Sequence, residues 1–342
     1  MPHDLHDLGE LPGVSYVMPV LNEAAHVVDA VQSLLAQDYA GPSEVVLALG
    51  PSTDGTDAAV AALAAVEPRI TTVANPSGST PAGLNRAIEA STHPIIVRVD
   101  AHSILPANYT RTAIEVIRRT GADNVGGVMD AQGVSPFEQA VAVAYGSRIG
   151  LGGTRHHTSG REGPAETVYL GVFRRQSLLD AGLFDEGFKR GQDWELNRRI
   201  RQRGGVVWFT PVLTVGYRPR ASVRELAKQF FSTGVWRGEL ARRFPANNGP
   251  RYWMPPIMVL LVALGIIAGC LGGLSPWWLL GLIIPVGYLL LVLAATTLAR
   301  AHGPKAMAWL IVVLPVIHFT WGVGFILGFL KLTRNLAEFT GR

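Results

Sequence analysis

The first hundred residues alternate between short apolar runs and longer segments whose apolar residues recur at helical spacing. The short runs predict strands over Val14–Pro19, Glu44–Leu49, Ile70–Val73 and Ile95–Val99. The longer segments predict helices over Asn22–Gln37, Asp57–Val66 and Thr80–Ala90. Strands that alternate with helices in this way indicate a parallel, doubly wound α/β sheet. In such sheets ligands bind at the carboxyl ends of the strands, so we expect the chemistry there.

Toward the C-terminal end the pattern changes to three long apolar runs, over Ile257–Leu274, Trp277–Leu298 and Trp309–Leu330. Each run is close to the roughly 20 residues that cross a hydrocarbon core about 30 Å thick. Between Trp253 and Leu330 the only charged residues are Arg300 and Lys305. We therefore expect a membrane domain of about three spans.

The charges around these runs predict an orientation. The break at Gly272–Pro276 is uncharged, whereas Arg300–Lys305 is basic, and other basic residues precede the first run at Arg237, Arg242, Arg243 and Arg251. The positive-inside tendency then places the globular part in the cytoplasm. Three spans would, however, put the last basic residues outside, at Lys331, Arg334 and Arg342. A re-entrant segment at Pro255–Pro256 or Pro315 is therefore an alternative.

Composition supports this division of the chain. Charged residues make up only 16% of the sequence, and the net charge is +4. The single cysteine, Cys270, excludes a disulfide framework. The first 20 residues lack an apolar signal segment, and no clustered basic and aromatic strands indicate nucleic-acid binding. We expect a multi-pass protein of the cytoplasmic (inner) membrane with five parts: a tail (1–13), an α/β domain (14–220), an amphipathic linker region (221–252), a transmembrane domain (253–330) and a C-terminal tail (331–342).

Polar residues follow the predicted strands, and each group can be interpreted as functional or as purely structural. Asp100 and His102 come directly after an apolar strand, and a carboxylate and an imidazole on one side of an extended segment could share a divalent ion. Asp193 lies near a predicted helix start, where a carboxylate could take a proton from a hydroxyl. The alternatives are a solvated turn for the first pair and a favourable helix dipole for Asp193. His318, within the third apolar run, has either a packing or a functional role.

Eight segments together carry more information than any one of them: Pro19–Glu23, Ser52–Thr56, Ser79–Ala90, Val97–His102, Glu166–Arg175, Gly182–Glu186, Gln192–Arg199 and Gln229–Arg237. In this order they resemble the family 2 glycosyltransferases, which have the nucleotide-sugar-binding GT-A fold. The likeness is strongest to the membrane-bound branch typified by succinoglycan-biosynthesis glycosyltransferases. It covers roughly residues 14–245 and the C-terminal runs.

The resemblance implies a role for each matching residue. It implies a donor site formed by Pro19, Asn22, Glu23, Ser52, Asp54, Asn85, Arg98 and Asp100. Asp100 and His102 would hold Mg²⁺ or Mn²⁺ against the donor diphosphate, and Asp193 would be the catalytic base of an inverting transfer. The acceptor and diphosphate side would include Gln192, Gln229, Trp236 and Arg237. The last three depart from the family's Gln-x-x-Arg-Trp motif in order and spacing.

Three further features stay ambiguous. Family members usually carry an acid after the second strand that contacts the nucleotide base, and Leu49 stands there instead. The glycine-rich segment at 150–157, with Arg155, His156 and His157, is either a mobile loop near the site or a linker. Ser222–Phe244 combines apolar and basic residues, as expected of a helix at a membrane interface or of one that packs between domains.

The function implied is sugar transfer from a nucleotide-sugar donor to a membrane-associated acceptor, such as a lipid-linked saccharide, in surface polysaccharide or glycolipid synthesis. One alternative is transfer to a polyprenyl phosphate. Another, of a different class, is a membrane-anchored scaffold whose donor site has decayed at Leu49.

Overall fold

The computed structural model describes residues 9–151, 160–188 and 190–333. The chain forms two compact units, each built from two segments. The first comprises residues 1–130 and 155–217, and the second comprises 131–154 and 218–342. One boundary between the units falls after residue 217, and a short segment after residue 130 belongs with the C-terminal apolar helices.

The first unit contains one eight-stranded sheet with the strand order β3-β2-β1-β4-β7-β5-β8-β6. The strands are β1 (Val14–Val20), β2 (Ser43–Leu49), β3 (Ile70–Ala74), β4 (Ile95–Arg98), β5 (Asn124–Ala131), β6 (Gly163–Pro164), β7 (Tyr169–Arg174) and β8 (Val207–Tyr217). The first four are parallel, as the sequence pattern predicts. β7 pairs antiparallel with both β4 and β5, so the complete sheet is mixed.

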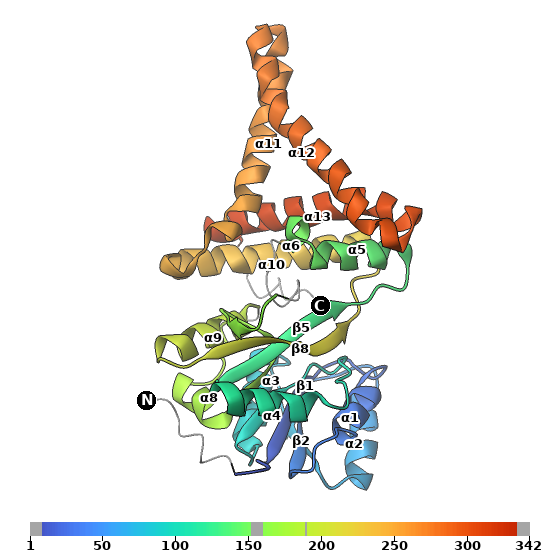
Figure 1. The fold of residues 1–342 in the computed structure, drawn as a ribbon, viewed down its shortest axis with the longest axis vertical. Coiled ribbons are helices and arrows are strands. Elements are labelled where there is room, and N and C mark those ends of the chain that lie inside the picture. Colours follow the sequence, from blue (N-terminus) through green and yellow to red (C-terminus); the bar gives the residue numbers. More distant parts are fainter. Residues whose placement is uncertain (1–8, 152–159, 189, 334–342) are drawn as a thin grey trace. The chain divides into compact units, whose positions relative to one another are not determined.

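The helices of this unit cover both faces of the sheet. They are α1 (Val27–Leu35), α2 (Thr56–Val66), α3 (Thr80–Ala90), α4 (Tyr109–Thr120), α8 (Arg175–Ala181) and α9 (Gln192–Gln202). Successive strand residues point to opposite faces, so Tyr16 and Met18 pack with α1, α2 and α4, whereas Val17 packs with α3, α8 and α9. Two buried cores, one on each face, give the doubly wound architecture that the alternating pattern predicts (Figure 1).

The second unit is helical. Its elements are α5 (Pro136–Gly146), α6 (Arg148–Leu151), α10 (Val223–Arg243), α11 (Met254–Cys270), α12 (Ile283–Ala295) and α13 (Pro304–Phe329), with short 3-10 turns between them. The three apolar stretches of spanning length are Met254–Gly273, Pro276–Arg300 and Pro304–Phe329, which confirms the three runs seen in the sequence. Within this unit α13 lies along α10, and α11 and α12 form a hairpin (Figure 1).

Close packing of α10 and α13 depends on glycine. A Cβ atom at Gly234 would lie 2.1 Å from the carbonyl oxygen of Trp321, and one at Gly328 would lie 2.1 Å from that of Val235. Real Cβ atoms do not approach so closely, so any side chain here would force the helices apart. Small residues allow two helix backbones to touch in this way.

One carboxylate ties three segments of the first unit together. Glu44 on β2 accepts hydrogen bonds from the Ser15 hydroxyl of β1 (2.6 Å) and from the backbone N–H (2.6 Å) and hydroxyl (2.9 Å) of Thr92, just before β4. Burial alone would raise the pKa of Glu44, but these donors outweigh it and hold the pKa below its ordinary value. The ionised form is therefore the stabilising one.

We predict that Glu44→Gln destabilises this edge of the sheet by about 1–2 kcal/mol, since it replaces charge-assisted hydrogen bonds. Hydrogen–deuterium exchange over residues 14–20 should speed up relative to wild type. Because the folded pKa is lowered, the wild-type advantage should be present at neutral pH and fade as the pH falls below the usual range of a glutamate. Glu115→Gln, at an exposed position on α4, is the matched control; equal exchange in the two variants would contradict the assignment.

Candidate active site

A buried arginine joins two carboxylates that are far apart in the sequence. Arg98 is the last residue of β4 and is only 7% exposed. Its Nη1 donates to Oδ2 of Asp193 at 2.7 Å, and its Nη2 donates to Oδ1 of Asp100 at 2.9 Å. The proposed catalytic base and the proposed metal ligand therefore meet at one point, the carboxyl end of β4, where ligands bind in sheets of this kind.

The charges of this cluster shift one another's protonation. Burial raises the pKa of Asp193 above its ordinary value; Arg98 opposes this rise, and repulsion from Asp100 adds to it. The two carboxylates in turn hold the pKa of Arg98 above its usual range, despite its burial. Arg98 therefore stays positive, and Asp193 is a stronger proton acceptor than an ordinary aspartate.

Local sequence explains why Asp193 lies at this point. Gly191 adopts a left-handed conformation (φ 73°) and is the N-cap of α9, so Asp193 falls in the first helical turn, as predicted. The inward positions Leu196 and Ile200 are buried in the core. Asn197, also buried, accepts from Nδ2 of Asn124 on β5 at 2.7 Å. These contacts fix the helix that carries Asp193 against the sheet.

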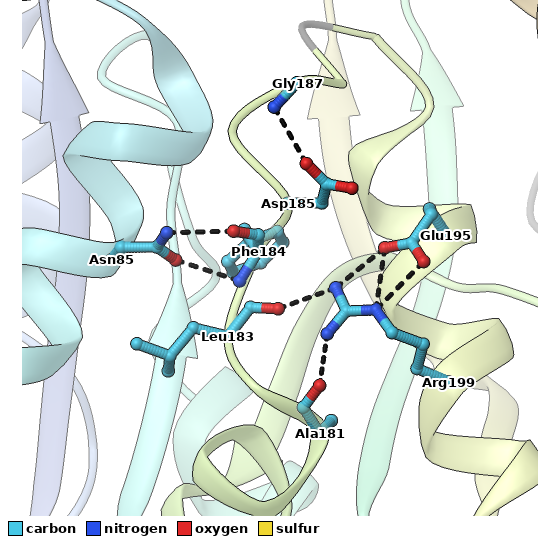
Figure 2. A network of polar contacts seen from close by, with 8 residues as sticks. All are labelled: Asn85, Ala181, Leu183, Phe184, Asp185, Gly187, Glu195 and Arg199. Carbon is cyan, nitrogen blue, oxygen red and sulfur yellow. Dashed lines mark hydrogen bonds and ion pairs between the residues drawn. The ribbon is translucent and has the colours of Figure 1, made fainter.

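A second polar network holds the segment that precedes α9 (Figure 2). Arg199 of α9 is paired with Glu195 at 2.7 Å and donates to the carbonyls of Ala181 and Leu183. Leu183 has a positive φ of 60°, a conformation that side chains other than glycine rarely adopt. The guanidinium therefore stabilises a strained turn between α8 and α9.

Asn85 of α3 joins this network. Its Oδ1 accepts from the backbone N–H of Phe184 and its Nδ2 donates to the Phe184 carbonyl, both at 2.9 Å (Figure 2). The side chain is 8% exposed. Asn85 thus clamps the turn before α9, and its predicted contact with the donor stays a prediction.

Asp100 and His102 do not lie on an extended strand. β4 ends at Arg98, and residues 101–102 form a turn in which the N–H of Ser103 donates to the Asp100 carbonyl at 2.9 Å. The simple i, i+2 argument for their pairing therefore fails. His102 Nδ1 instead lies 3.1 Å from Oε1 of Glu23, which follows β1. Within the part of the chain that the structure describes, no cluster of three or more His, Cys, Asp or Glu side chains could hold a metal.

The residues after β1 and β2 that the sequence predicts to bind the donor form hydrogen bonds with one another. Asn22, with a positive φ of 54°, accepts from the N–H of Thr53 at 2.8 Å, and its own N–H donates to the Ser52 hydroxyl at 3.1 Å. Asp54 accepts from the N–H of Ala24 at 3.1 Å and from the Thr56 hydroxyl at 2.5 Å. The helix predicted to start at Asn22 begins only at Val27.

The remaining predicted residues lie in different places. Pro19 is a buried residue of β1, and Gln192 is the first residue of α9. The other three acceptor-side residues, Gln229, Trp236 and Arg237, belong to α10 in the second unit. There the Arg237 guanidinium lies 3.4 Å from the centre of the Tyr252 ring. Leu49, at the end of β2, packs against the core and offers no polar group to a base. Residues 152–157 of the glycine-rich segment lie outside the described residues.

Tyr169 lies near the Arg98 cluster, and the sequence did not single it out. Burial raises the pKa of its hydroxyl, and the charge of Asp100 raises it further, which places the phenol in the field of the Arg98 cluster. The next residue, Leu170, is fully buried with a positive φ of 43°. Its carbonyl accepts from the Tyr109 hydroxyl at 2.8 Å. Backbone strain of this kind concentrates at functional sites, but a sequence does not display it.

The chain is similar to several known proteins. Residues 15–180 match the family model described as Glycosyl transferase family 2. The chain is 31% identical over 333 residues to succinoglycan biosynthesis protein ExoA of Rhizobium meliloti (strain 1021), covering 94% of this chain and 96% of that one. It is 24% identical over 330 residues to a dolichyl N-acetyl-alpha-D-glucosaminyl phosphate 3-beta-D-2,3-diacetamido-2,3-dideoxy-beta-D-glucuronosyltransferase of Methanococcus voltae, covering 93% and 97%.

A solved structure supports the fold. It is the mannosyltransferase PcManGT from Pyrobaculum calidifontis in complex with GDP-Man and Mn²⁺, with a TM-score of 0.56 and 18% identity, covering 94% of this chain and 88% of that one. The eight-stranded sheet is thus of the GT-A type that the motifs predict. A sheet of this type and homology to ExoA along nearly the whole chain lead to one conclusion: the chain belongs to glycosyl transferase family 2 and is a glycosyltransferase.

Proposed function

We propose that this protein transfers a sugar from a nucleotide-sugar donor to a lipid-linked saccharide at the cytoplasmic face of a membrane, with inversion at the anomeric carbon. The observation that carries the proposal is the Arg98 bridge, which brings Asp193, a partly exposed acid in the first turn of α9, beside Asp100, which follows a central strand. The M. voltae relative, named for transfer to a dolichyl-linked sugar, supports the class of acceptor. The three apolar helices of spanning length support the membrane location.

In this proposal Asp193 is the general base. Its carboxylate takes the proton of the acceptor hydroxyl, whose oxygen then attacks the anomeric carbon on the face opposite the nucleotide. The bond from that carbon to the diphosphate oxygen breaks, and the nucleoside diphosphate leaves with the electron pair. Arg98 orients the carboxylate toward the acceptor, and the anchored α9 keeps it in place.

In this proposal a divalent ion would be held by two side chains, Asp100 and His102. Asp100 offers a carboxylate and His102 an imidazole whose Nδ1 is oriented by Glu23, an arrangement common around metal-bound histidines. Nε2 of His102 would then be the ligand atom. When bound, Mg²⁺ or Mn²⁺ would supply positive charge to the leaving diphosphate.

Asp193→Asn should lower the rate of sugar transfer by about 100-fold or more, because the amide cannot accept the proton. Release of nucleoside diphosphate from a panel of nucleotide sugars measures the rate, and binding of the responsive donor shows that the site is intact. Asp180→Asn, on the surface of α8, is the control. Transfer at the wild-type rate by Asp193→Asn would refute the assignment of the base.

Replacing Arg98 tests the bridge itself. Arg98→Met should lower transfer by about 10- to 100-fold, since both carboxylates lose the group that orients them. Arg98→Lys keeps the charge but not the two-pronged geometry, and should fall between wild type and Arg98→Met. The control is Arg86→Met, an exposed arginine on α3. Equal rates in Arg98→Met and the control would show that the bridge is dispensable.

We also predict that sugar transfer depends on a divalent metal ion. EDTA should abolish transfer and Mn²⁺ should restore it. In Asp100→Asn, direct binding of Mn²⁺ followed by electron paramagnetic resonance should weaken by about 10-fold or more. Asp57→Asn, on the exposed side of α2, should bind Mn²⁺ as wild type does. Full activity in EDTA, or unchanged binding in Asp100→Asn, would contradict the proposed metal site.

A further inference from the structure

The third apolar helix, α13, joins the two ends of the α11–α12 hairpin within the second unit. It begins at Pro304, directly after the turn that ends the second apolar stretch at Arg300. At its other end the rings of Phe325 and Phe329 lie 5.1 Å and 5.3 Å from that of Trp253, the residue before α11. A hairpin that crosses a bilayer twice has both ends on one side, so both ends of α13 lie on that side.

The C-terminal half of α13 packs along a charged helix. Gly324 and Gly328 approach the backbone of α10, and Gly234 and Gly238 of α10 approach that of α13, so the two helices run in parallel at the same level. α10 carries seven charged side chains: Arg224, Glu225, Lys228, Arg237, Glu239, Arg242 and Arg243. Because the two helices touch along this length, this half of α13 lies at the same depth in the membrane as the charged helix α10.

The N-terminal half of α13 also contacts polar elements. Trp309 packs edge-to-face on Phe137 of α5 with ring centres 5.2 Å apart, and Glu138 of that helix, 1% exposed, is ion-paired with Arg218 at 3.0 Å. In the middle of α13, Nε2 of His318 lies 2.7 Å from the carbonyl oxygen of Ile149 on α6. Nδ1 of the same ring lies 3.0 Å from the Tyr288 hydroxyl of α12.

A crossing by α13 would take these neighbours into the hydrocarbon. Placing Arg, Lys or Asp at the centre of a bilayer costs several kcal/mol per residue, even on permissive scales. The hairpin is less enclosed by protein: 17% and 11% of the residues in the apolar stretches of α11 and α12 are buried, against 39% for α13. The hairpin therefore presents more of its surface to lipid than α13 does.

We propose that α13 lies in the plane of the membrane interface beside α10 and that only α11 and α12 cross the bilayer. Its partly exposed apolar residues, among them Ile311, Val312 and Val323, then face the acyl chains of one leaflet. α5 and α10 follow directly from the catalytic unit, so this leaflet is the one on the catalytic side. Lys331 then lies on that side as well, in agreement with the positive-inside tendency.

Spin-label depth measures the orientation of α13 directly. In a Cys270→Ser background, nitroxides are attached at Val316→Cys, in the middle of α13, or at Val323→Cys, nearer its end, and their depth in proteoliposomes is read from oxygen and nickel accessibility. Seven residues of helix span about 10 Å. An in-plane helix places both labels at the same depth, whereas a crossing helix places the first at the bilayer centre and the second well away from it, which would overturn the proposal. Ile257→Cys, near the start of α11, and Leu264→Cys, in its middle, are the matched pair that should differ.

Labelling from each side of the membrane tests the number of crossings. Leu332→Cys, just after α13, should react with an impermeant maleimide in inverted vesicles and not in spheroplasts, as should Ala61→Cys in the catalytic unit. Gly273→Cys, at the tip of the hairpin, should react in the opposite preparation. If Leu332→Cys reacts together with Gly273→Cys, α13 crosses and the proposal is wrong.

Discussion

The candidate active site depends on one buried cation, Arg98, that holds two acids in place. Asp100 and Asp193 would repel each other, and the low-dielectric surroundings of Arg98 would penalise each charge left unpaired. One guanidinium, with donors spaced as a fork, satisfies both carboxylates at 2.7 and 2.9 Å. The end of β4 and the start of α9 are thus joined through side chains, and the rest of the first unit supports this junction.

Further hydrogen bonds hold the elements that carry the two acids. α9 is anchored to the sheet through Asn197 and to the preceding turn through Arg199, and that turn is in turn clamped by Asn85 of α3 (Figure 2). On the donor side, the loops after β1 and β2 are joined by reciprocal hydrogen bonds between Asn22 and residues 52–53. Several residues that look like donor ligands in the sequence therefore have structural partners of their own.

The sequence pattern predicted those elements whose apolar and polar residues repeat over a short stretch of chain. The first four strands, the helices between them, the start of α9 and the three apolar runs all follow from residues that lie near one another in the chain. The antiparallel strands were not predicted, because β7 inserts between β4 and β5 and such a pairing leaves no local signature. The Arg98 bridge spans 95 residues, and the turn at residues 101–102 replaced an expected extended segment. The apolar length of α13 also predicts a membrane span. Its charged neighbours lie on α5 and α10, which are distant in sequence, so the sequence pattern did not indicate them.

The central claim is that an acid poised beside Arg98 activates the acceptor for a single displacement. The most direct test is the anomeric configuration of the sugar in the product, determined by nuclear magnetic resonance after transfer from a donor of known configuration. One attack by a hydroxyl deprotonated by Asp193 inverts that centre, so donor and product should have opposite configurations. A product that retains the donor's configuration would contradict the account.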